Sequence, residues 1–351
     1  MLNALRRFGV CAPMLEAIKD IYKDRQFTVS DNGQASTVRP QRAGISQGCP
    51  LSPFLFGILM TVLMTDAQAG LSSNAKDSIN KGVLEDVLYA DDTLVIGSVG
   101  KQVEEYMASI EKCGHEYGLT IHWGKVQLVS VCSEQSLQGP GGQAIPKSVS
   151  MLYLGSTIHS DGKFRAEVAR KIGTATGDFQ TLALVWKNAN VSRTRKINIF
   201  EALVLSKLRY STASAWLAKG DLRKLDGFHA RCLRRIMGIK PAYVSRISNE
   251  RVRTLANRLP LSVDIRRAQL NLLGQVMIEP AKAILRAATF HGDTLLPETC
   301  AWVRNVGRPR HDWTSQLFSL SQRAAGTATM WDSATASLDA WTVLVQKACT
   351  L

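Results

Sequence analysis

The spacing of apolar residues predicts a mixed helix and strand structure for the first 160 residues of this chain. Leu15, Ile18 and Tyr22 follow the three- and four-residue spacing of a helix. Short apolar runs bounded by turn residues predict strands elsewhere. The expected elements are, in order, a helix over residues 1–30, two short strands over 28–42, a loop over 44–53, a buried helix over 54–69, a β-hairpin over 83–96, a helix over 101–117, a strand pair made of 119–123 and 126–131, and a further strand over 151–158.

From residue 161 onward the pattern changes to successive helices. Apolar residues at helical spacing mark three of them, over residues 164–186, 197–208 and 222–237, and Asp221 is expected to be the N-cap of the third. The remainder looks helical but less regular, and its expected packing anchors are the tryptophans Trp302, Trp313, Trp331 and Trp341. The pattern therefore predicts an α+β protein whose second part is all helical.

Composition is that of an ordinary globular protein, with 45% hydrophobic and 21% charged residues. The longest apolar stretch, residues 54–64, is shorter than the roughly 20 residues that a bilayer requires, so no membrane span is expected. No secretory signal is expected at the N-terminus either. The seven scattered cysteines never show C-x-x-C spacing, and His291, Cys300 and His311 lack the spacing of a zinc knuckle. The sequence thus predicts a reducing compartment, without a disulfide framework or a zinc site.

Charge is distributed unevenly along the chain. Lys and Arg exceed Asp and Glu by 14 in the whole chain, yet residues 1–150 have a net charge of −2 and residues 151–351 a net charge of +16. A weakly acidic first part and a strongly basic second part indicate a reaction site followed by a polyanion-binding surface. A solvated basic surface without a ligand is the alternative.

Paired carboxylates stand on the turn of the hairpin expected over residues 83–96. Tyr89-Ala90-Asp91-Asp92 separates two short apolar runs, which would place both aspartates at a rigid, exposed edge. Carboxylate oxygens are the ligands that Mg²⁺ prefers, and two such ions can activate an attacking 3′-hydroxyl and stabilise leaving pyrophosphate. Taken alone, the tetrapeptide is better explained as an ordinary Asp-Asp turn.

Three further segments accompany this tetrapeptide in a fixed order. Residues 44–53, GISQGCPLSP, form a loop whose glycine allows close backbone approach, although a plain helix-entry loop is the alternative. Residues 118–125, GLTIHWGK, and residues 153–155, YLG, follow downstream. His122 has no second metal ligand nearby in the sequence, so it is interpreted as a packing or hydrogen-bonding residue.

The order of these four segments resembles the reverse transcriptases of non-LTR (long interspersed element) retrotransposons. QGCPLSPFLF resembles that family's motif B, YADD motif C, GLTIHWGK motif D and YLG motif E. Group II intron maturases also carry YADD, but their motif B usually reads less like QGCPLSP. The resemblance covers residues 1–250 and implies a partial right-hand polymerase palm over residues 1–160, a thumb-like helical segment over 161–245 and a helical C-terminal region over 246–351.

The resemblance also implies a function and its residues. The function is RNA-directed DNA polymerase activity with Mg²⁺ or Mn²⁺, an RNA template, a DNA primer and deoxynucleoside triphosphates, and without a small-molecule redox cofactor. Asp91 and Asp92 would be metal ligands, and Lys125 would donate a proton to pyrophosphate, although a solvated lysine is the alternative. His122 stands where the family usually has Asn. The residues implied in template or primer binding are Gln47, Gly48, Tyr89, Tyr153, Leu154 and Gly155.

Basic residues on two of the expected helices complete the predicted interface. They are interpreted as phosphate contacts that follow a template–primer duplex without reading its sequence. A solvated helix face is the alternative. The residues are Arg193, Arg195, Lys196, Lys207, Arg209, Arg231, Arg234 and Arg235. Gly307-Arg308-Pro309-Arg310 is interpreted as a linker, although it superficially resembles a minor-groove-binding motif.

One element of the family pattern is missing from this sequence. The family has a further aspartate, in motif A, on a strand before the helices that precede motif B. The carboxylates before Gly44 are Glu16, Asp20, Asp24 and Asp31, and none stands in a predicted strand. We therefore expect this chain to be a fragment lacking the fingers and motif A, and to be inactive alone. A non-catalytic nucleic-acid-binding remnant is the alternative function, and a nuclear location is implied by the family only.

Overall fold

The computed structural model describes residues 1–350 except 42, 132, 282 and 299–311. The chain divides into two compact units, unit 1 (Met1–Ser148) and unit 2 (Val149–Leu351). This division falls before the boundary at residue 160 that the sequence suggested. It coincides with the change in charge, since unit 1 is weakly acidic and unit 2 strongly basic.

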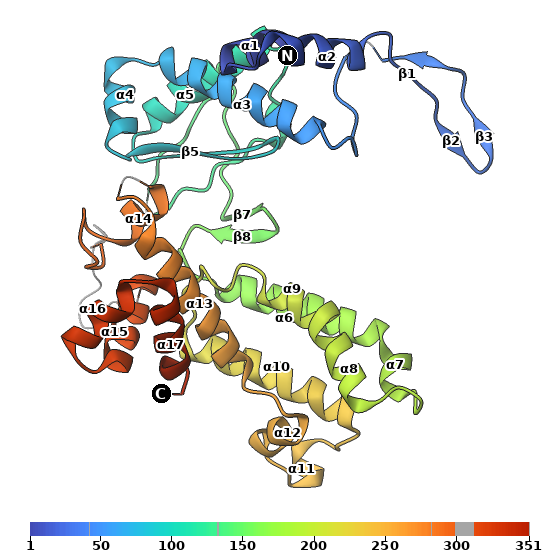
Figure 1. Cartoon of the computed structure of the whole chain (residues 1–351), viewed down its shortest axis with the longest axis vertical. Coiled ribbons are helices and arrows are strands. Elements are labelled where there is room, and N and C mark those ends of the chain that lie inside the picture. The colour runs from blue at the N-terminus through green and yellow to red at the C-terminus, as the bar shows by residue number, and fades with distance from the viewer. Residues whose placement is uncertain (42, 132, 282, 299–311, 351) are drawn as a thin grey trace. The chain divides into compact units, whose positions relative to one another are not determined.

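Unit 1 combines helices with short antiparallel strand pairs (Figure 1). The strands pair as β1 with β4, β2 with β3, and β5 with β6. The elements are α1 (Leu2–Phe8), α2 (Ala12–Tyr22), β1 (Gln26–Phe27), β2 (Ser30–Asp31), β3 (Gln34–Ala35), β4 (Arg39–Pro40), α3 (Ser52–Ala69), α4 (Ser73–Asn80), β5 (Leu84–Tyr89), β6 (Asp92–Gly97), α5 (Gly100–Glu116) and the 3₁₀ turn η1 (Trp123–Lys125).

The N-terminal helix is broken, so the single helix expected over residues 1–30 is wrong. Gly9 ends α1 with φ +99°, and its N–H bonds back to the carbonyls of Arg6 and Leu5. Pro13 stands in the first turn of α2, where its missing N–H costs nothing. The turn at Asn32-Gly33 is confirmed, because both residues have the positive φ that a tight hairpin requires.

Helix α3 is the central helix of unit 1. One face buries Leu55, Leu59 and Leu63 in apolar clusters that also contain residues of α1, α2 and α5. By length and composition α3 is apolar enough to cross a membrane. The core helix of a globular protein meets the same test, and these contacts explain its apolar character. Arg7 of α1 forms an ion pair with Asp66 near the end of α3, and the Tyr117 hydroxyl donates to that carboxylate.

The β5–β6 hairpin is confirmed over residues 84–97. Its inner face contributes Leu84, Leu88 and Val95 to the cluster between α3 and α5. Asp86, also on this face, accepts hydrogen bonds from Tyr106 of α5 at 2.7 Å and from Gln68 of α3 at 3.0 Å. Burial and the Asp86 carboxylate raise the pKa of Tyr106, which therefore stays a neutral donor. This buried network fixes the hairpin against both helices.

The strand pair expected over residues 119–131 is wrong. Residues 123–125 form the 3₁₀ turn η1, whose backbone bonds are local, and Leu128 makes only an isolated bridge to Lys147. The apolar side chains of this segment pack against the cluster between α3 and α5, and the Trp123 indole donates to Glu111. Alternate side chains of residues 119–128 pack against α3 and α5, and this explains why the sequence pattern resembles that of a strand.

In its described residues, unit 2 consists mainly of helices and has one hairpin of paired strands (Figure 1). The strand expected over residues 151–158 is wrong in form, because these residues make two strands joined by a turn at Leu154-Gly155. The elements are β7 (Ser150–Tyr153), β8 (Ser156–His159), α6 (Arg165–Thr181), α7 (Ala183–Lys187), α8 (Arg193–Phe200), a π-helical turn (Glu201–Leu205), α9 (Ser206–Arg209), α10 (Lys219–Met237), α11 (Ala242–Ser245), α12 (Asn249–Ala256), α13 (Leu261–Ile278), α14 (Ile284–Thr289), α15 (Trp313–Ala325), α16 (Ala328–Thr335) and α17 (Leu338–Ala348).

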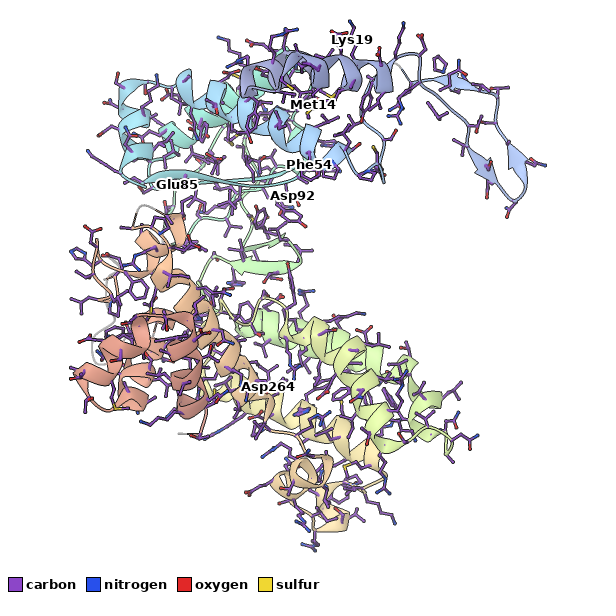
Figure 2. The ribbon with its side chains drawn as sticks, viewed as in Figure 1. Met14, Lys19, Phe54, Glu85, Asp92 and Asp264 are labelled. Carbon is purple, nitrogen blue, oxygen red and sulfur yellow. The ribbon has the colours of Figure 1, made fainter. Side chains whose placement is uncertain are left out.

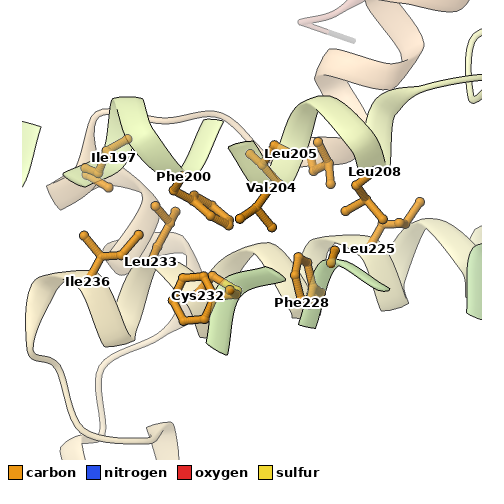
Figure 3. Close-up of a cluster of buried hydrophobic side chains, with 14 of the residues drawn as sticks. Ile197, Phe200, Val204, Leu205, Leu208, Leu225, Phe228, Cys232, Leu233 and Ile236 are labelled. Atoms are coloured by element: carbon orange, nitrogen blue, oxygen red, sulfur yellow. The ribbon is translucent and has the colours of Figure 1, made fainter. Parts of the chain in front are cut away.

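The three helical regions expected between residues 164 and 237 are confirmed and share one core. Figure 3 shows Ile197 and Phe200 of α8 facing Leu233 and Ile236 of α10. The expected cap is wrong: α10 begins at Lys219 after Ala218, so Asp221 lies inside the first turn, where it is buried. An acidic residue there still complements the positive end of the helix dipole.

A second core joins α13 to the three C-terminal helices. Trp331 and Trp341 are buried in it with ring centroids 5.8 Å apart, and the Trp341 indole donates to the Leu270 carbonyl at 2.8 Å. Trp313 donates to the Ala213 carbonyl at 2.8 Å, so the three expected anchors that lie in the described residues, Trp313, Trp331 and Trp341, all contribute to packing. The remaining interpretations on Cys300, Trp302, Gly307–Arg310 and His311 fall outside the described residues.

Candidate polymerase site

The paired aspartates lie at the turn of β5–β6, as expected. Tyr89 and Asp92 are the last register pair, so Ala90 and Asp91 alone make the turn, and Ala90 adopts φ +53°. Alanine in the left-handed region is strained by about 1–2 kcal/mol relative to its usual backbone conformation. Figure 2 shows Asp92 at the turn end of the hairpin and Glu85 toward its other end. The tight turn projects both carboxylates from a short, paired scaffold.

The outer face of this hairpin is apolar and exposed next to the carboxylates. Tyr89 is 64% exposed and Ile96 is 50% exposed, while Asp91 and Asp92 are exposed at the turn. Within the described residues neither aspartate has an ion pair or a side-chain hydrogen bond. Both carboxylates thus keep their oxygen lone pairs for an external ligand.

The donor set suits a divalent cation that keeps other ligands. Mg²⁺ is commonly bound through one or two carboxylates together with water and substrate phosphates. In the described residues no group of three or more His, Cys, Asp or Glu side chains is placed to hold a metal ion. Asp91 and Asp92 therefore fit a cation shared with a substrate, without a third protein carboxylate beside them.

The loop before α3 presents Gln47 and Gly48 to solvent. The Cys49 N–H bonds to the Ser46 carbonyl across a four-residue turn, and Gly48 has φ +84° at its third position, where glycine is favoured. The Ser52 hydroxyl donates to the same Ser46 carbonyl at 2.8 Å, which ties the turn to the start of α3. Backbone N–H groups at this helix start lower the pKa of the Cys49 thiol. The loop is thus an ordered, exposed turn.

Lys125 is exposed at the end of η1. Its segment is held by Trp123, whose indole donates to Glu111 at 2.5 Å. Among the described residues, no hydrogen bond or ion pair joins Lys125, Gln47 or Gly48 to Asp91 or Asp92. The structure thus places these residues in unit 1 on three separate segments, and their common role stays a prediction.

Tyr153, Leu154 and Gly155 lie at the turn of β7–β8, in unit 2. Leu154 and Gly155 have φ +47° and +75°. Their carbonyls are both bonded: the Tyr210 hydroxyl donates to Leu154 at 2.7 Å and the Arg170 guanidinium to Gly155 at 3.0 Å. The turn is therefore anchored to α6 and to the end of α9.

A buried ion pair beneath this turn was missed in the sequence. Glu167 is 2% exposed and accepts from Arg170, and Lys171 is 6% exposed, with its ammonium 3.7 Å from Glu167 and 5.2 Å from the Tyr210 ring centroid. Burial opposes ionisation of Glu167, but bonds from Arg170 and Thr157 hold its pKa below the usual range. Burial lowers the pKa of Lys171. The sequence did indicate the burial of Lys171, because Lys171 lies at helical spacing from the apolar residues Val168 and Ala175.

The basic residues of the second part divide into three groups. Two are buried, so their placement on an exposed face is wrong: Lys196 is 7% exposed, and Arg234 is 5% exposed and bonds the Ile247 carbonyl and Asn249. Two are paired, Lys207 with Asp178 at 3.0 Å and Arg209 with Asp264 at 2.5 Å. The exposed residues without an ion pair in the described chain are Arg193, Arg195, Arg231 and Arg235.

These four arginines lie at one end of a helix pair. Ile197 of α8 faces Leu233 and Ile236 of α10 (Figure 3), so the start of α8 meets the end of α10. Arg193 and Arg195 occupy that start, and Arg231 and Arg235 that end. Four exposed guanidinium groups in this arrangement can contact successive phosphates.

Comparison with known proteins agrees with the motif order. Residues 1–158 match the reverse transcriptase (RNA-dependent DNA polymerase) family, a range that includes all four motif segments. The chain is 26% identical over 240 residues to the RNA-directed DNA polymerase from mobile element jockey of Drosophila melanogaster, covering 63% of this chain and 25% of that protein.

Two further relatives extend the comparison. The Pol polyprotein from type-1 retrotransposable element R2 of Popillia japonica is 24% identical over 265 residues, which cover 72% of this chain and 42% of that protein. A transposon-derived protein of Caenorhabditis elegans is 26% identical over 257 residues, covering 68% of this chain and 86% of that protein. This chain thus spans a quarter to two fifths of the jockey and R2 relatives, and the similarity continues beyond residue 158. Residues 1–158 therefore match the reverse transcriptase family, and these relatives support the similarity to non-LTR retrotransposon reverse transcriptases that the motif order predicted.

Proposed function

We propose that this chain provides the active-site turn and the template–primer grip of an RNA-directed DNA polymerase. The exposed, unpaired Asp91–Asp92 turn carries this proposal, because it sits in a domain of the reverse transcriptase family. Unit 1 acts as a partial palm, and residues 149–245 of unit 2 act as a thumb. The substrates are an RNA template, a DNA primer and deoxynucleoside triphosphates.

Each exposed segment of unit 1 has a role in this proposal. Asp91 and Asp92 hold Mg²⁺ or Mn²⁺, which when bound lowers the barrier for attack of the primer 3′-hydroxyl. Tyr89 and the apolar outer face of the hairpin lie against the primer end. Gln47 and Gly48 line the pocket for the template and the nucleotide, where a glycine permits close backbone approach. Lys125 donates a proton toward the leaving pyrophosphate.

Unit 2 holds the duplex without reading its sequence. The turn at Leu154-Gly155 supports the primer strand, and its bonded carbonyls keep it in one conformation. Arg193, Arg195, Arg231 and Arg235 contact phosphates through charge, so this binding weakens as salt rises. Lys207 and Arg209 contribute less, because each already has a carboxylate partner.

A catalytically inactive, nucleic-acid-binding form is the second candidate function. One observation favours it: no third metal-ligating side chain joins Asp91 and Asp92 in the described residues. Two metal ions close together repel each other, and bridging carboxylates offset that repulsion. Both candidates predict duplex binding, and they differ only in synthesis.

Primer extension on an RNA template separates the two candidates. The purified full chain is assayed with Mg²⁺ or Mn²⁺ beside Asp91→Asn, with Asp20→Asn, an exposed carboxylate of α2, as the matched control. Polymerase function predicts synthesis that falls by about 100-fold or more in Asp91→Asn and is unchanged in the control. Absence of synthesis, with duplex binding retained, selects the inactive form.

A further inference from the structure

Unit 2 contains a cavity of about 1040 Å³ whose described lining carries positive charge only. It lies where the start of α10 meets α13 and α15. Lys219, Arg266 and Arg323 line it, together with Trp216 and Trp313, and none of its sixteen described lining residues is Asp or Glu. This cavity belongs to neither the β5–β6 turn nor the four-arginine end of α8 and α10.

The three basic side chains are available to a ligand. Lys219 and Arg266 have no ion pair or side-chain hydrogen bond within the described residues. Arg323 donates only to the Ser319 carbonyl one turn earlier in its own helix, at 3.3 Å. Three neighbouring cations repel one another, and an anionic ligand would remove that repulsion.

Three carboxylates stand near the cavity but outside its lining, and two of them accept hydrogen bonds from serines that line it. Asp226 accepts from the backbone N–H of Ser262 at 2.9 Å and from its hydroxyl at 2.7 Å. Asp312 accepts from Ser315 and caps α15. Asp221 lies 3.9 Å from Lys224 on α10. These contacts hold each carboxylate in the protein framework, outside the cavity lining.

Two indole rings beside the basic side chains indicate that the ligand is a nucleotide or a short oligonucleotide. The Trp313 ring is held by its bond to the Ala213 carbonyl, and the buried Trp216 indole nitrogen has no partner among the described residues. Flat aromatic surfaces next to cations are typical of sites that stack bases and bind phosphates. A cavity of this size accepts a few unpaired nucleotides, whereas a duplex exceeds the volume of a small-ligand site.

We propose that this cavity binds a segment of single-stranded nucleic acid. Lys219, Arg266 and Arg323 contact its phosphates, and a base stacks on the half-buried indole of Trp216 or Trp313. The site goes beyond polymerase chemistry and gives the chain a second place to hold an unpaired strand. RNA and DNA share this chemistry, and the experiment compares them.

Binding of labelled oligonucleotides of about ten residues to the full chain tests the proposal. Single-stranded RNA and DNA are titrated by fluorescence anisotropy against Arg266→Gln and Lys219→Gln, with circular dichroism to verify folding. The matched controls are Arg251→Gln and Lys347→Gln, exposed basic residues of unit 2 outside the cavity. We expect each cavity variant to weaken binding by about 3- to 10-fold and to reduce the salt slope by about 0.7, with the controls within about two-fold.

Two results would overturn the proposal. Equal losses in the cavity variants and the controls would mean that net charge alone binds the strand. Tight binding of inorganic phosphate or a mononucleotide, sensitive to Arg266→Gln, without oligonucleotide binding would assign the cavity to a small anion. This test does not depend on primer extension, because single-strand binding can be measured in a variant that synthesises no DNA. The proposed duplex grip is tested separately by Arg231→Gln, which should weaken duplex binding and leave single-strand binding at the cavity unchanged.

Discussion

The Tyr210 hydroxyl donates a hydrogen bond to the Leu154 carbonyl at 2.7 Å, which joins the end of α9 to the turn of β7–β8. The neighbouring Gly155 carbonyl accepts from Arg170, so the two left-handed residues of the turn are each held by one side chain. The conformation of the turn proposed to support the primer therefore depends on residues outside the Tyr153–Gly155 segment.

Replacing Tyr210 by Phe removes one of these bonds and keeps the ring over Lys171. We expect the turn to open more readily, with amide hydrogen exchange at Leu154–Ser156 faster by about 5- to 10-fold, since one exposed hydrogen bond contributes about 1 kcal/mol. Exchange measured by mass spectrometry on the full chain checks this. Tyr243→Phe is the control, because Tyr243 is 80% exposed; equal exchange in both variants would show that the bond does not hold the turn.

Replacing Tyr106 by Phe removes a hydroxyl from the buried network under the β5–β6 hairpin. Asp86 and Gln68 then lose a partner in a site where Tyr106 itself is fully buried. The free energy of unfolding is expected to fall by about 1–3 kcal/mol in urea titration. A double-mutant cycle with Gln68→Leu should give a coupling of about 0.5 kcal/mol or more. Strict additivity would contradict a shared network.

Replacing Ala90 by Gly relieves the left-handed strain beside Asp91. The gain of about 1–2 kcal/mol is partly offset by the greater unfolded-state entropy of glycine, about 0.5–1 kcal/mol. We expect the free energy of unfolding to rise by up to about 1 kcal/mol, measured by urea titration. A loss of stability would show that the alanine methyl group makes a contact that the strain argument omits.

Replacing His229 by Leu tests a buried, unpartnered imidazole. His229 is 2% exposed and stacks near Phe200, and neither ring nitrogen has a hydrogen-bond partner in the part of the chain that the structure describes. Burial, reinforced by Arg209 against weaker opposing effects of Asp226 and Glu201, lowers its pKa from 6.5 to about 4. Between these two values the unfolded chain therefore binds more protons than the folded chain. The contribution of neutral His229 to the free energy of unfolding is fully present above pH 6.5 and is lost as the pH falls toward 4.

This linkage predicts a difference between the two proteins as pH changes. From pH 7 to pH 5 the free energy of unfolding should fall by about 2 kcal/mol more in the wild-type chain than in His229→Leu, because the leucine variant lacks the titrating group. At pH 7 the variant should also be more stable, since it removes two unsatisfied polar atoms. Parallel stability curves from pH 7 to pH 5 would contradict the lowered pKa.

Local patterns predicted the parts of the fold that depend on neighbouring residues. The β5–β6 hairpin, the long helices α3 and α5, and the turn at Asn32-Gly33 all follow from periodicity and turn chemistry. Residues 119–131 were misassigned because alternating apolar side chains pack equally well on helices as in a sheet, and the choice is made by distant partners.

Burial of charged residues could not be predicted from helical position alone. Arg234 stands on α10 among exposed arginines, yet the loop that follows folds back and supplies the Ile247 carbonyl and Asn249 as its partners. Lys171 and Glu167 are one turn apart on α6, and helical spacing gave a signal for the burial of Lys171, but the Tyr210 ring that packs against Lys171 comes from a distant segment. Such burial depends on contacts that are remote in the sequence.

Photocrosslinking from the primer tests the central claim, that the primer 3′-end lies at the Asp91–Asp92 turn, whether or not the chain synthesises DNA. A template–primer duplex with a photoreactive thymidine at the primer 3′-end, or at its 5′-end as the control, is bound to the full chain, irradiated and digested with trypsin. The account predicts 3′-end labelling of the peptide of residues 82–101, which contains Tyr89, and of residues 148–163, which contain the YLG turn. Equal labelling of these peptides from both ends, or 3′-end labelling only elsewhere, would contradict it.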